Sequence, residues 1–209
     1  MPKIPKLFLY SLGLPDEQYA TLARLAGKLP KEIKVAAIEN AADVIPDSAG
    51  WVKATRDAFT YHGFDVEAID LRHCQGQALR EKLIHKDVIW VGGGNTFYLR
   101  WIMKESGADE IIPALVRLGK VYAGWSAGAI VAGPTLRAFD AMDDPAEAPE
   151  IIWEGLGMTQ AVIVPHMDND DFAASAARTN QQLLAEGCNA LALDDMQVVV
   201  IQGDEQQIY

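Results

Sequence analysis

Residues 120–133 read KVYAGWSAGAIVAG and are the most informative segment of the sequence. Its first half favours a strand, and the small residues of its second half suit a closely packed helix. Ser126 has Gly124 and Gly128 on either side, which completes the pattern Gly-x-Ser-x-Gly. A glycine-rich turn of this kind can serve only to pack a helix on a sheet. On a tight strand-to-helix turn, however, the pattern is typical of a serine nucleophile exposed at the sheet edge.

Strand-like and helix-like segments alternate on both sides of this stretch. The expected strands are 6–12, 33–38, 65–70, 87–92, 120–125, 161–165, 189–193 and 197–201. The expected helices are 17–28, 46–62, 76–84, 96–106, 109–118 and 171–186. Helices that repeatedly separate apolar strands indicate a parallel sheet covered on both faces. We therefore predict a single α/β domain over residues 1–209, with a doubly wound, mostly parallel sheet.

Composition narrows the class of protein. The chain has 209 residues, of which 50% are hydrophobic, enough for a sizeable core. No apolar run reaches the roughly 18 residues of a membrane span, and the N-terminal stretch lacks a signal-peptide pattern. We therefore expect no membrane partner, a cytoplasmic location, and a monomer or homodimer. The formal net charge of −11 argues against a nucleic-acid partner, which would require a basic face.

The cysteines and histidines indicate neither a disulfide framework nor a metal site. Cys74 and Cys188 are the two cysteines, and both are expected to be unreactive thiols. The four histidines show no metal-ligand spacing. We therefore expect no metal and no other cofactor.

Polar groups follow four of the expected strands. Gly92–Asn95 follows DVIWV, Ser126 follows VYAGW, His166 follows AVIVP, and Asp194 and Asp195 follow NALAL. In an open parallel sheet, ligands bind beyond the carboxyl ends of the strands. We therefore expect a nucleophile, a base, an acid and a glycine-rich loop to share one edge. His166 would take the proton of Ser126 through Nε2 and return it to a leaving amine.

The acid partner of the histidine comes from one of two groups of aspartates. Asp194 and Asp195, at a strand end, give the chain order Ser, His, Asp. Asp140, Asp143 and Asp144 lie in the loop FDAMDDPAEAPE and give Ser, Asp, His, which is the order of α/β-hydrolases. That fold usually has a histidine near the C-terminus and an oxyanion loop after an early strand, and this chain shows neither. We select Asp195, with Asp194 or Asp140 as the alternatives.

The loop VGGGNTFYLR places glycines before an expected helix. Such a loop can bind phosphate, but here it lacks both Gly-x-Gly-x-x-Gly and the Lys-Ser/Thr of a P-loop. A tight turn without a binding role is the plain alternative. As a functional element, a backbone N–H of Gly93 or Gly94 would face that of Ala127 and form an oxyanion hole.

Three motifs, VGGGNTFYLR, GWSAGAIVAGPT and PHMDND, together resemble the S51 serine peptidases. This family includes dipeptidase E (α-aspartyl dipeptidase) and, more distantly, cyanophycinase. The resemblance is carried by residues 86–166, with looser similarity elsewhere. It implies a flavodoxin-like α/β sandwich related to class I glutamine amidotransferases, with serine in place of their cysteine.

The resemblance also implies roles for individual residues. Ser126 would be the nucleophile and His166 the base. Gly94 and Ala127 would supply the oxyanion N–H groups, and Asn95 would contact the polar backbone of the substrate.

Two departures from the family pattern affect the acid and the specificity. The family glutamate near the C-terminus falls on Asp195, and an acid placed after the elbow has its nearest counterpart in Asp140, one step away. Where dipeptidase E has Gly-Glu-Thr-Arg-Glu, this chain has DFAASAARTNQQ, in which Arg178 is the only basic residue. Arg178 either binds an aspartate carboxylate of the substrate or simply faces solvent.

Taken together, these patterns predict a serine exopeptidase acting on dipeptides or short peptides, with N-terminal aspartate as the preference that the resemblance implies. Two other interpretations use the same residues. One is a non-catalytic small-molecule binding or sensing protein, and the other is an esterase or acyl transferase with the same triad.

Overall fold

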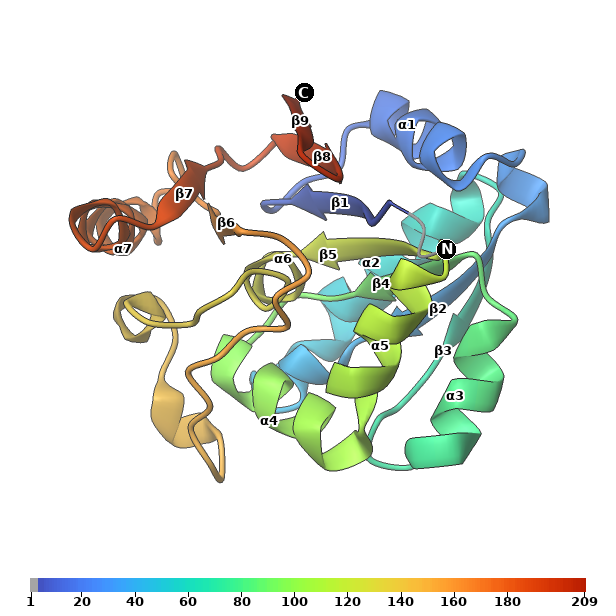
Figure 1. Ribbon diagram of the computed structural model, residues 1–209, viewed down its shortest axis with the longest axis horizontal. Coiled ribbons are helices and arrows are strands. Elements are labelled where there is room, and N and C mark those ends of the chain that lie inside the picture. Colours follow the sequence, from blue (N-terminus) through green and yellow to red (C-terminus); the bar gives the residue numbers. More distant parts are fainter. Residues whose placement is uncertain (1–3) are drawn as a thin grey trace.

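A block of five parallel strands forms the centre of the computed structural model, which describes residues 4–209 (Figure 1). Residues 1–3, which the single-domain prediction includes, lie outside the described part. The strands are β1 (Lys6–Tyr10), β2 (Lys34–Ile38), β3 (Asp65–Ala68), β4 (Val88–Val91) and β5 (Val121–Trp125). They pair in the order β3-β2-β4-β5-β1. The mostly parallel sheet predicted from the alternation of segments is therefore present.

Helices cover both faces of this sheet. They are α1 (Asp16–Ala26), α2 (Ala49–Tyr61), α3 (Gly76–Ile84), α4 (Thr96–Ser106) and α5 (Ala108–Arg117). On one face, Leu22 of α1 and Phe59 of α2 pack in one core with Trp90. On the other, side chains of α3, α4 and α5 pack in a second core with Ile89 and Tyr122. Successive strand residues point to opposite faces, so the central strands are apolar throughout and buried on both sides.

Two antiparallel strands extend the sheet beyond β1. β8 (Val198–Gln202) pairs with the whole length of β1, and β9 (Glu205–Ile208) forms the outer edge. The sequence analysis did not predict β9, because its residues EQQI have no apolar alternation. All four of those residues are exposed, so no buried face imposes a pattern on them.

The segment that carries His166 departs from the single sheet expected from the sequence. β6 (Ala161–Val164) and β7 (Asn189–Ala192) form a separate two-stranded parallel sheet, connected through α7 (Ala173–Ala185). The reason is steric, because β8 already occupies the free edge of β1. The short helix α6 (Ala127–Ile130) follows β5 and contacts β6, and Gly133 just after it packs against Ala161 of β6.

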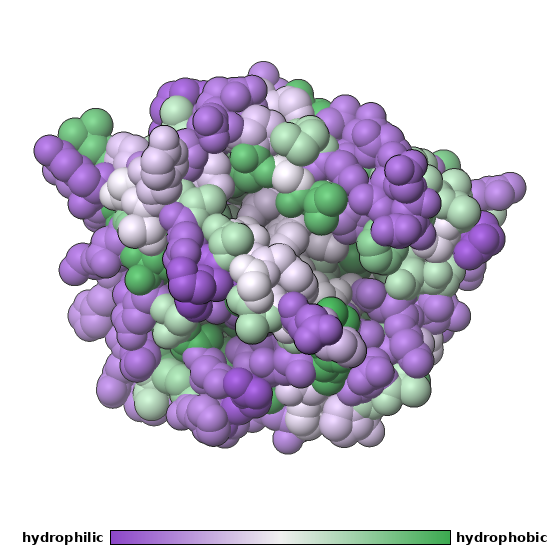
Figure 2. All heavy atoms as spheres, turned by 180° about the vertical axis from the view of Figure 1, so that it is seen from behind, coloured by the Kyte–Doolittle hydropathy of each residue, from purple (hydrophilic) through white to green (hydrophobic). Residues whose placement is uncertain are grey.

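Four short 3-10 helices complete the elements of residues 4–209: η1 (Pro30–Glu32), η2 (Asn40–Ala42), η3 (Phe139–Ala141) and η4 (Pro145–Glu147). The face opposite to that of Figure 1 is largely hydrophilic, with a hollow near its middle where weakly polar and apolar residues gather (Figure 2). Within residues 4–209, no helix is both long enough and apolar enough to cross a membrane.

Candidate active site

Ser126 occupies a sharp turn between β5 and α6. Its backbone angles are φ 48° and ψ −111°, a region that non-glycine residues seldom adopt. The flanking glycines are required by close packing, because a Cβ at Gly124 would lie 2.4 Å from the carbonyl oxygen of Gly128. A Cβ at Gly128 would lie 2.2 Å from the carbonyl oxygen of Val91 in β4. The turn therefore has the geometry of a nucleophile elbow, which projects the serine side chain from the sheet edge.

His166 follows β6 and lies directly against this serine. Its Nε2 is 2.8 Å from Oγ of Ser126, and its residue surface is 4% exposed. The backbone of His166 has φ 69°, again in the left-handed region. Its N–H donates to Oγ of Ser11, at 2.8 Å, just beyond the end of β1. The imidazole is therefore positioned from the main sheet, although β6 does not belong to that sheet.

Asp195 is the strand-end acid that contacts this histidine. Its Oδ1 lies 2.8 Å from Nδ1 of His166, and its Oδ2 accepts from the side-chain amide of Asn169 at 2.6 Å. Its carbonyl oxygen accepts from the N–H groups of Leu12 and Gly13, at 2.9 and 2.8 Å. The loops after β1 and β7 are thereby joined. An aspartate carboxylate that accepts from Nδ1–H leaves Nε2 free to accept from the serine hydroxyl.

The other candidate acids lie in different environments. Asp194 is exposed, and Asp140 is exposed on η3. Asp144 caps η4, because its Oδ1 accepts from the N–H of Ala146 at 2.9 Å. Asp143, between η3 and η4, accepts the N–H of Thr96 at 3.0 Å, and burial raises the pKa of its carboxyl. The contacts of these residues do not support the order Ser, Asp, His.

The glycine-rich loop after β4 lies beside the elbow. A Cβ at Gly93 would stand 3.2 Å from Cβ of Ser126. Gly94 has φ 138°, and a Cβ there would lie 2.1 Å from the carbonyl oxygen of Ala41 in η2. Within residues 4–209, the N–H groups of Gly93, Gly94 and Ala127 have no hydrogen-bond acceptor. The loop and the first residue of α6 thus present unpaired donors near the serine.

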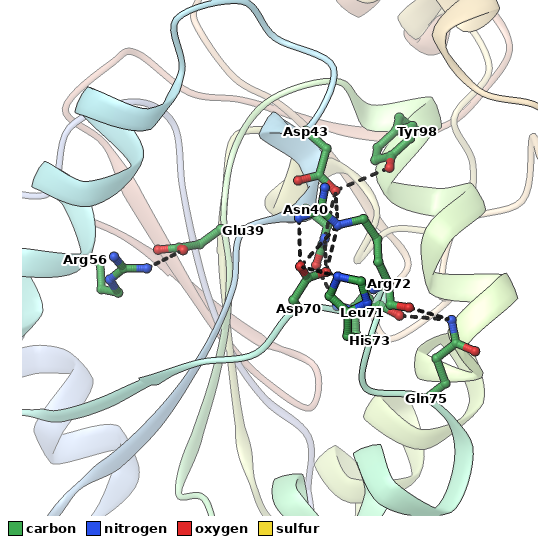
Figure 3. A network of polar contacts seen from close by, with 10 residues as sticks. All are labelled: Glu39, Asn40, Asp43, Arg56, Asp70, Leu71, Arg72, His73, Gln75 and Tyr98. Atoms are coloured by element: carbon green, nitrogen blue, oxygen red, sulfur yellow. Dashed lines mark hydrogen bonds and ion pairs between the residues drawn. The ribbon is translucent and has the colours of Figure 1, made fainter.

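Polar contacts around Asn40 and Asp70 hold η2 in place (Figure 3), and the glycine-rich loop packs against η2 through Gly94. The side-chain amide of Asn40 donates to Asp43 at 2.8 Å and to Asp70 at 3.0 Å, and its Oδ1 accepts the N–H of Leu71 at 3.0 Å. Arg72 donates to both carboxylate oxygens of Asp70. These bonds hold the pKa of Asp70 well below its usual range, the Arg72 guanidinium being the largest cause. The network fixes the backbone on which Gly94 rests.

The side chain of Asn95 is hydrogen-bonded within the protein. It is 3% exposed, its Oδ1 accepts the N–H of Tyr98 at 2.9 Å, and its amide donates to the carbonyl of Asp144 at 2.9 Å. It is therefore the N-cap of α4 and the attachment point of the acidic loop. Each end of its side chain therefore makes one structural hydrogen bond, and its expected contact with a substrate stays a prediction.

Arg178 lies away from the site. It is exposed on α7, whose buried residues are Ala176, Thr179 and Leu183. These recur along one face of the helix, and Arg178 points away from that face. Of the two alternatives for Arg178, the structure favours the one that faces solvent, because this arginine is exposed and does not line the pocket at Ser126.

A pocket of about 490 Å³ opens at Ser126 and His166. Its apolar walls are formed by Leu12, Ile45, Trp51, Trp125, Ile130, Met142 and Phe172, and its remaining lining by Thr55, Gly93, Gly94, Ser126, Asp143 and His166. The Trp51 and Trp125 rings meet edge to face at 5.4 Å, and the Phe172 ring lies 5.1 Å from that of His166. Ser11, Asn169 and these walls are site residues that the sequence analysis missed. The rule of polar groups at strand ends could have found Ser11, which follows β1.

The fold and site define an α/β protein with a serine on a strand-to-helix elbow, hydrogen-bonded to a histidine. The model of Peptidase family S51 matches residues 8–209, and the chain belongs to this family. The matched region includes the elbow at Ser126 and the glycine-rich loop after β4.

Individual relatives carry peptidase names. An uncharacterized peptidase of Pasteurella multocida (strain Pm70) is 30% identical over 61% of this chain and 62% of that protein. The chain thus spans less than two thirds of the length of that relative. Peptidase E of Nostoc sp. (strain PCC 7120) is 30% identical over 81% of this chain and 68% of that protein. A solved structure from Listeria monocytogenes EGD-e, with a provisional peptidase E name, superposes with TM-score 0.85 and 26% identity, covering 99% of this chain and 98% of that one.

Proposed function

We propose that this protein is a serine exopeptidase that hydrolyses dipeptides or very short peptides. The observation that carries the proposal is the continuous hydrogen-bonded series from Ser126 through His166 to Asp195, with both contacts at 2.8 Å. This series opens into a pocket whose volume suits a small ligand better than a long chain. Membership of a peptidase family supports the same reaction class.

The first half of the reaction forms an acyl-enzyme. Oγ of Ser126 attacks the scissile carbonyl carbon while Nε2 of His166 takes the hydroxyl proton. Asp195 stabilises the imidazolium that results and keeps the ring in its orientation. The carbonyl oxygen becomes an oxyanion, which the N–H groups of Gly94 and Ala127 stabilise.

The second half releases the products. His166 gives its proton to the leaving amine as the C–N bond breaks, which frees the C-terminal product. Water then attacks the ester of Ser126, with His166 again as the base, and the N-terminal product departs. Each step of this reaction is thus assigned to a residue of the site.

Two other functions use the same arrangement. An esterase or acyl transferase needs the same triad and differs in the leaving group or acceptor. A non-catalytic binding protein does not need a hydrogen-bonded Ser126–His166 pair, so the intact pair argues against that alternative. We also propose a cytoplasmic location, which the free thiols of Cys74 and Cys188 support.

A dipeptide library with varied N-terminal residues, read by mass spectrometry, tests the proposal. The wild-type protein should release free amino acids, and Ser126→Ala should release none. Labelling of the wild-type protein by a fluorophosphonate, with no peptide turnover but with ester turnover, would assign the site to an esterase. The absence of both labelling and turnover would favour a binding protein.

A further inference from the structure

We propose that this site selects dipeptides with a large apolar N-terminal residue, and that Asp143 binds their free α-ammonium group. The inference rests on the proposed peptidase function and names its substrate class. It follows from the chemistry of the pocket walls, the charges that line them, and the position of one carboxylate.

The walls are apolar and rigid. Seven of the thirteen residues that line the pocket are large hydrophobic side chains. Trp125 is stacked with Tyr10 and with Trp90, each at 6.4 Å between ring centroids, and Trp51 meets it edge-on. Burying an apolar side chain of the substrate against these walls removes it from water and lowers the free energy of the complex. Because the walls are already ordered, binding does not require them to rearrange.

The charges disfavour an acidic side chain. Within the described residues, no lysine or arginine lines the pocket, and Asp143 is its one carboxylate. Arg56, on the same helix as Thr55, is paired with Glu39 at 2.7 Å. Arg178 is exposed on α7. A substrate aspartate would therefore lose its hydration without gaining a cation, and it would meet a like charge.

Asp143 has one carboxylate oxygen to spare. Its Oδ2 accepts the N–H of Thr96 at 3.0 Å, and its own N–H donates to the carbonyl of Phe139 at 2.9 Å, which fixes its position. Among residues 4–209, its Oδ1 makes no hydrogen bond within 3.5 Å, and the Thr96 hydroxyl, which lies close enough to lower the pKa of the carboxyl, has no other partner. Asp143 lines the same pocket as Ser126.

A peptide α-ammonium is the group that matches this oxygen. It carries a positive charge and three N–H donors, and a hydrogen bond between two charged groups is stronger than one between neutral groups. Burial raises the pKa of the Asp143 carboxyl, and a cation beside it would offset that effect. Holding the amine in the pocket places the first peptide bond of the substrate near Ser126, which makes the enzyme act from the amino end.

The preference is tested by comparing kcat/KM for Leu-Ala, Phe-Ala, Asp-Ala and N-acetyl-Leu-Ala. We expect the two apolar dipeptides to exceed Asp-Ala by at least about 10-fold and to exceed the acetylated peptide similarly. In Asp143→Asn, which keeps the size of the side chain, the ratio of free to acetylated substrate should fall about 10- to 100-fold, the range of a charged hydrogen bond. The neighbouring Asp144→Asn is the matched control, because Asp144 lies outside the pocket, and its ratio should equal that of the wild type.

Binding to Ser126→Ala separates this inference from the proposed function. Calorimetric titration of that variant with Leu-Ala and Asp-Ala requires no turnover. Tighter binding of Leu-Ala, weakened by adding Asp143→Asn, would support the inference even if the wild type proved not to be a peptidase. Hydrolysis of Asp-Ala as fast as Leu-Ala, or an unchanged ratio in Asp143→Asn, would overturn the inference while leaving the peptidase proposal intact.

Discussion

The backbone N–H of His166 donates to Oγ of Ser11 at 2.8 Å, although 155 residues separate them in the sequence. Ser11 is fully buried and directly follows β1, the strand that pairs with β5 and its elbow. His166 has φ 69°, a conformation that persists only where its surroundings hold it. The main sheet therefore positions both partners of the proton transfer, one through β5 and the other through Ser11.

Ser11→Ala should lower kcat by about 10-fold and leave KM nearly unchanged, because the histidine loses its anchor and samples other positions. The free energy of unfolding should fall by about 1–3 kcal/mol, since a buried N–H is left without a partner. Steady-state kinetics and urea unfolding measure the two effects. Ser106→Ala is the matched control, because Ser106 is a buried serine that does not line the pocket at Ser126. It should affect stability alone, and an equal loss of kcat in both variants would refute the positioning role.

Ser126→Ala and His166→Ala should each remove nearly all turnover and leave the circular dichroism spectrum unchanged. Because the two side chains act as one unit, the double variant should be little worse than either single variant. Multiplicative losses in kcat/KM would mean that the 2.8 Å contact between them is not the catalytic one.

Asp195→Asn should reduce kcat by on the order of 10³–10⁴, because an amide in place of the carboxylate favours the wrong tautomer of His166. The adjacent Asp194→Asn is the control, since Asp194 is exposed and makes no contact with the imidazole. Its kcat should stay within about twofold of the wild type, as expected for a surface substitution. Equal losses in the two variants would reopen the choice of acid.

The sequence predicted much of this site because its residues obey one local rule. Ser126, His166 and Asp195 each follow an apolar strand segment, so a topological argument placed them together without knowledge of distances. The same rule, applied to the segment ending at Tyr10, would have indicated Ser11 as well. Asn95 could have been recognised as an N-cap, because it immediately precedes a helical pattern.

Other features depended on tertiary packing. The sequence gives no sign that β8 blocks the edge of β1 and diverts β6 into a second sheet. The charged residues of loop 139–150 predict a solvated surface. In the structure, however, the N–H of Thr96 at the start of α4 donates to Asp143 and holds it at the pocket. The aromatic wall of the pocket is formed by Trp51 of α2 and Trp125 of β5, which contact each other edge to face. Nothing in the sequence around either tryptophan indicates this tertiary contact.

Gly94→Ala should cut kcat by about 10²–10³, the range for loss of one oxyanion donor, with a smaller change in KM. The added Cβ would lie 2.1 Å from the carbonyl oxygen of Ala41, so the loop has to move away from η2. Gly50→Ala is the control, because a Cβ there meets nothing within 4 Å. Normal kinetics in Gly94→Ala, with the fold intact, would remove this loop from the oxyanion hole.

The polar network around Asn40 and Asp70 should make stability sensitive to acid. Because Arg72 holds the folded-state pKa of Asp70 below its usual value of about 3.9, the carboxylate contributes stability above that pH. The contribution is lost as pH falls toward the lowered folded-state pKa, since the unfolded chain then binds the proton first. Its size is modest, because the Asp70 side chain is 34% exposed and solvent screens the pair. Urea unfolding of the wild type and Asp70→Asn should therefore differ most near pH 7, and the difference should begin to shrink below about pH 4. A difference that stays constant between pH 7 and pH 3 would show that the ionised carboxylate is not what stabilises η2.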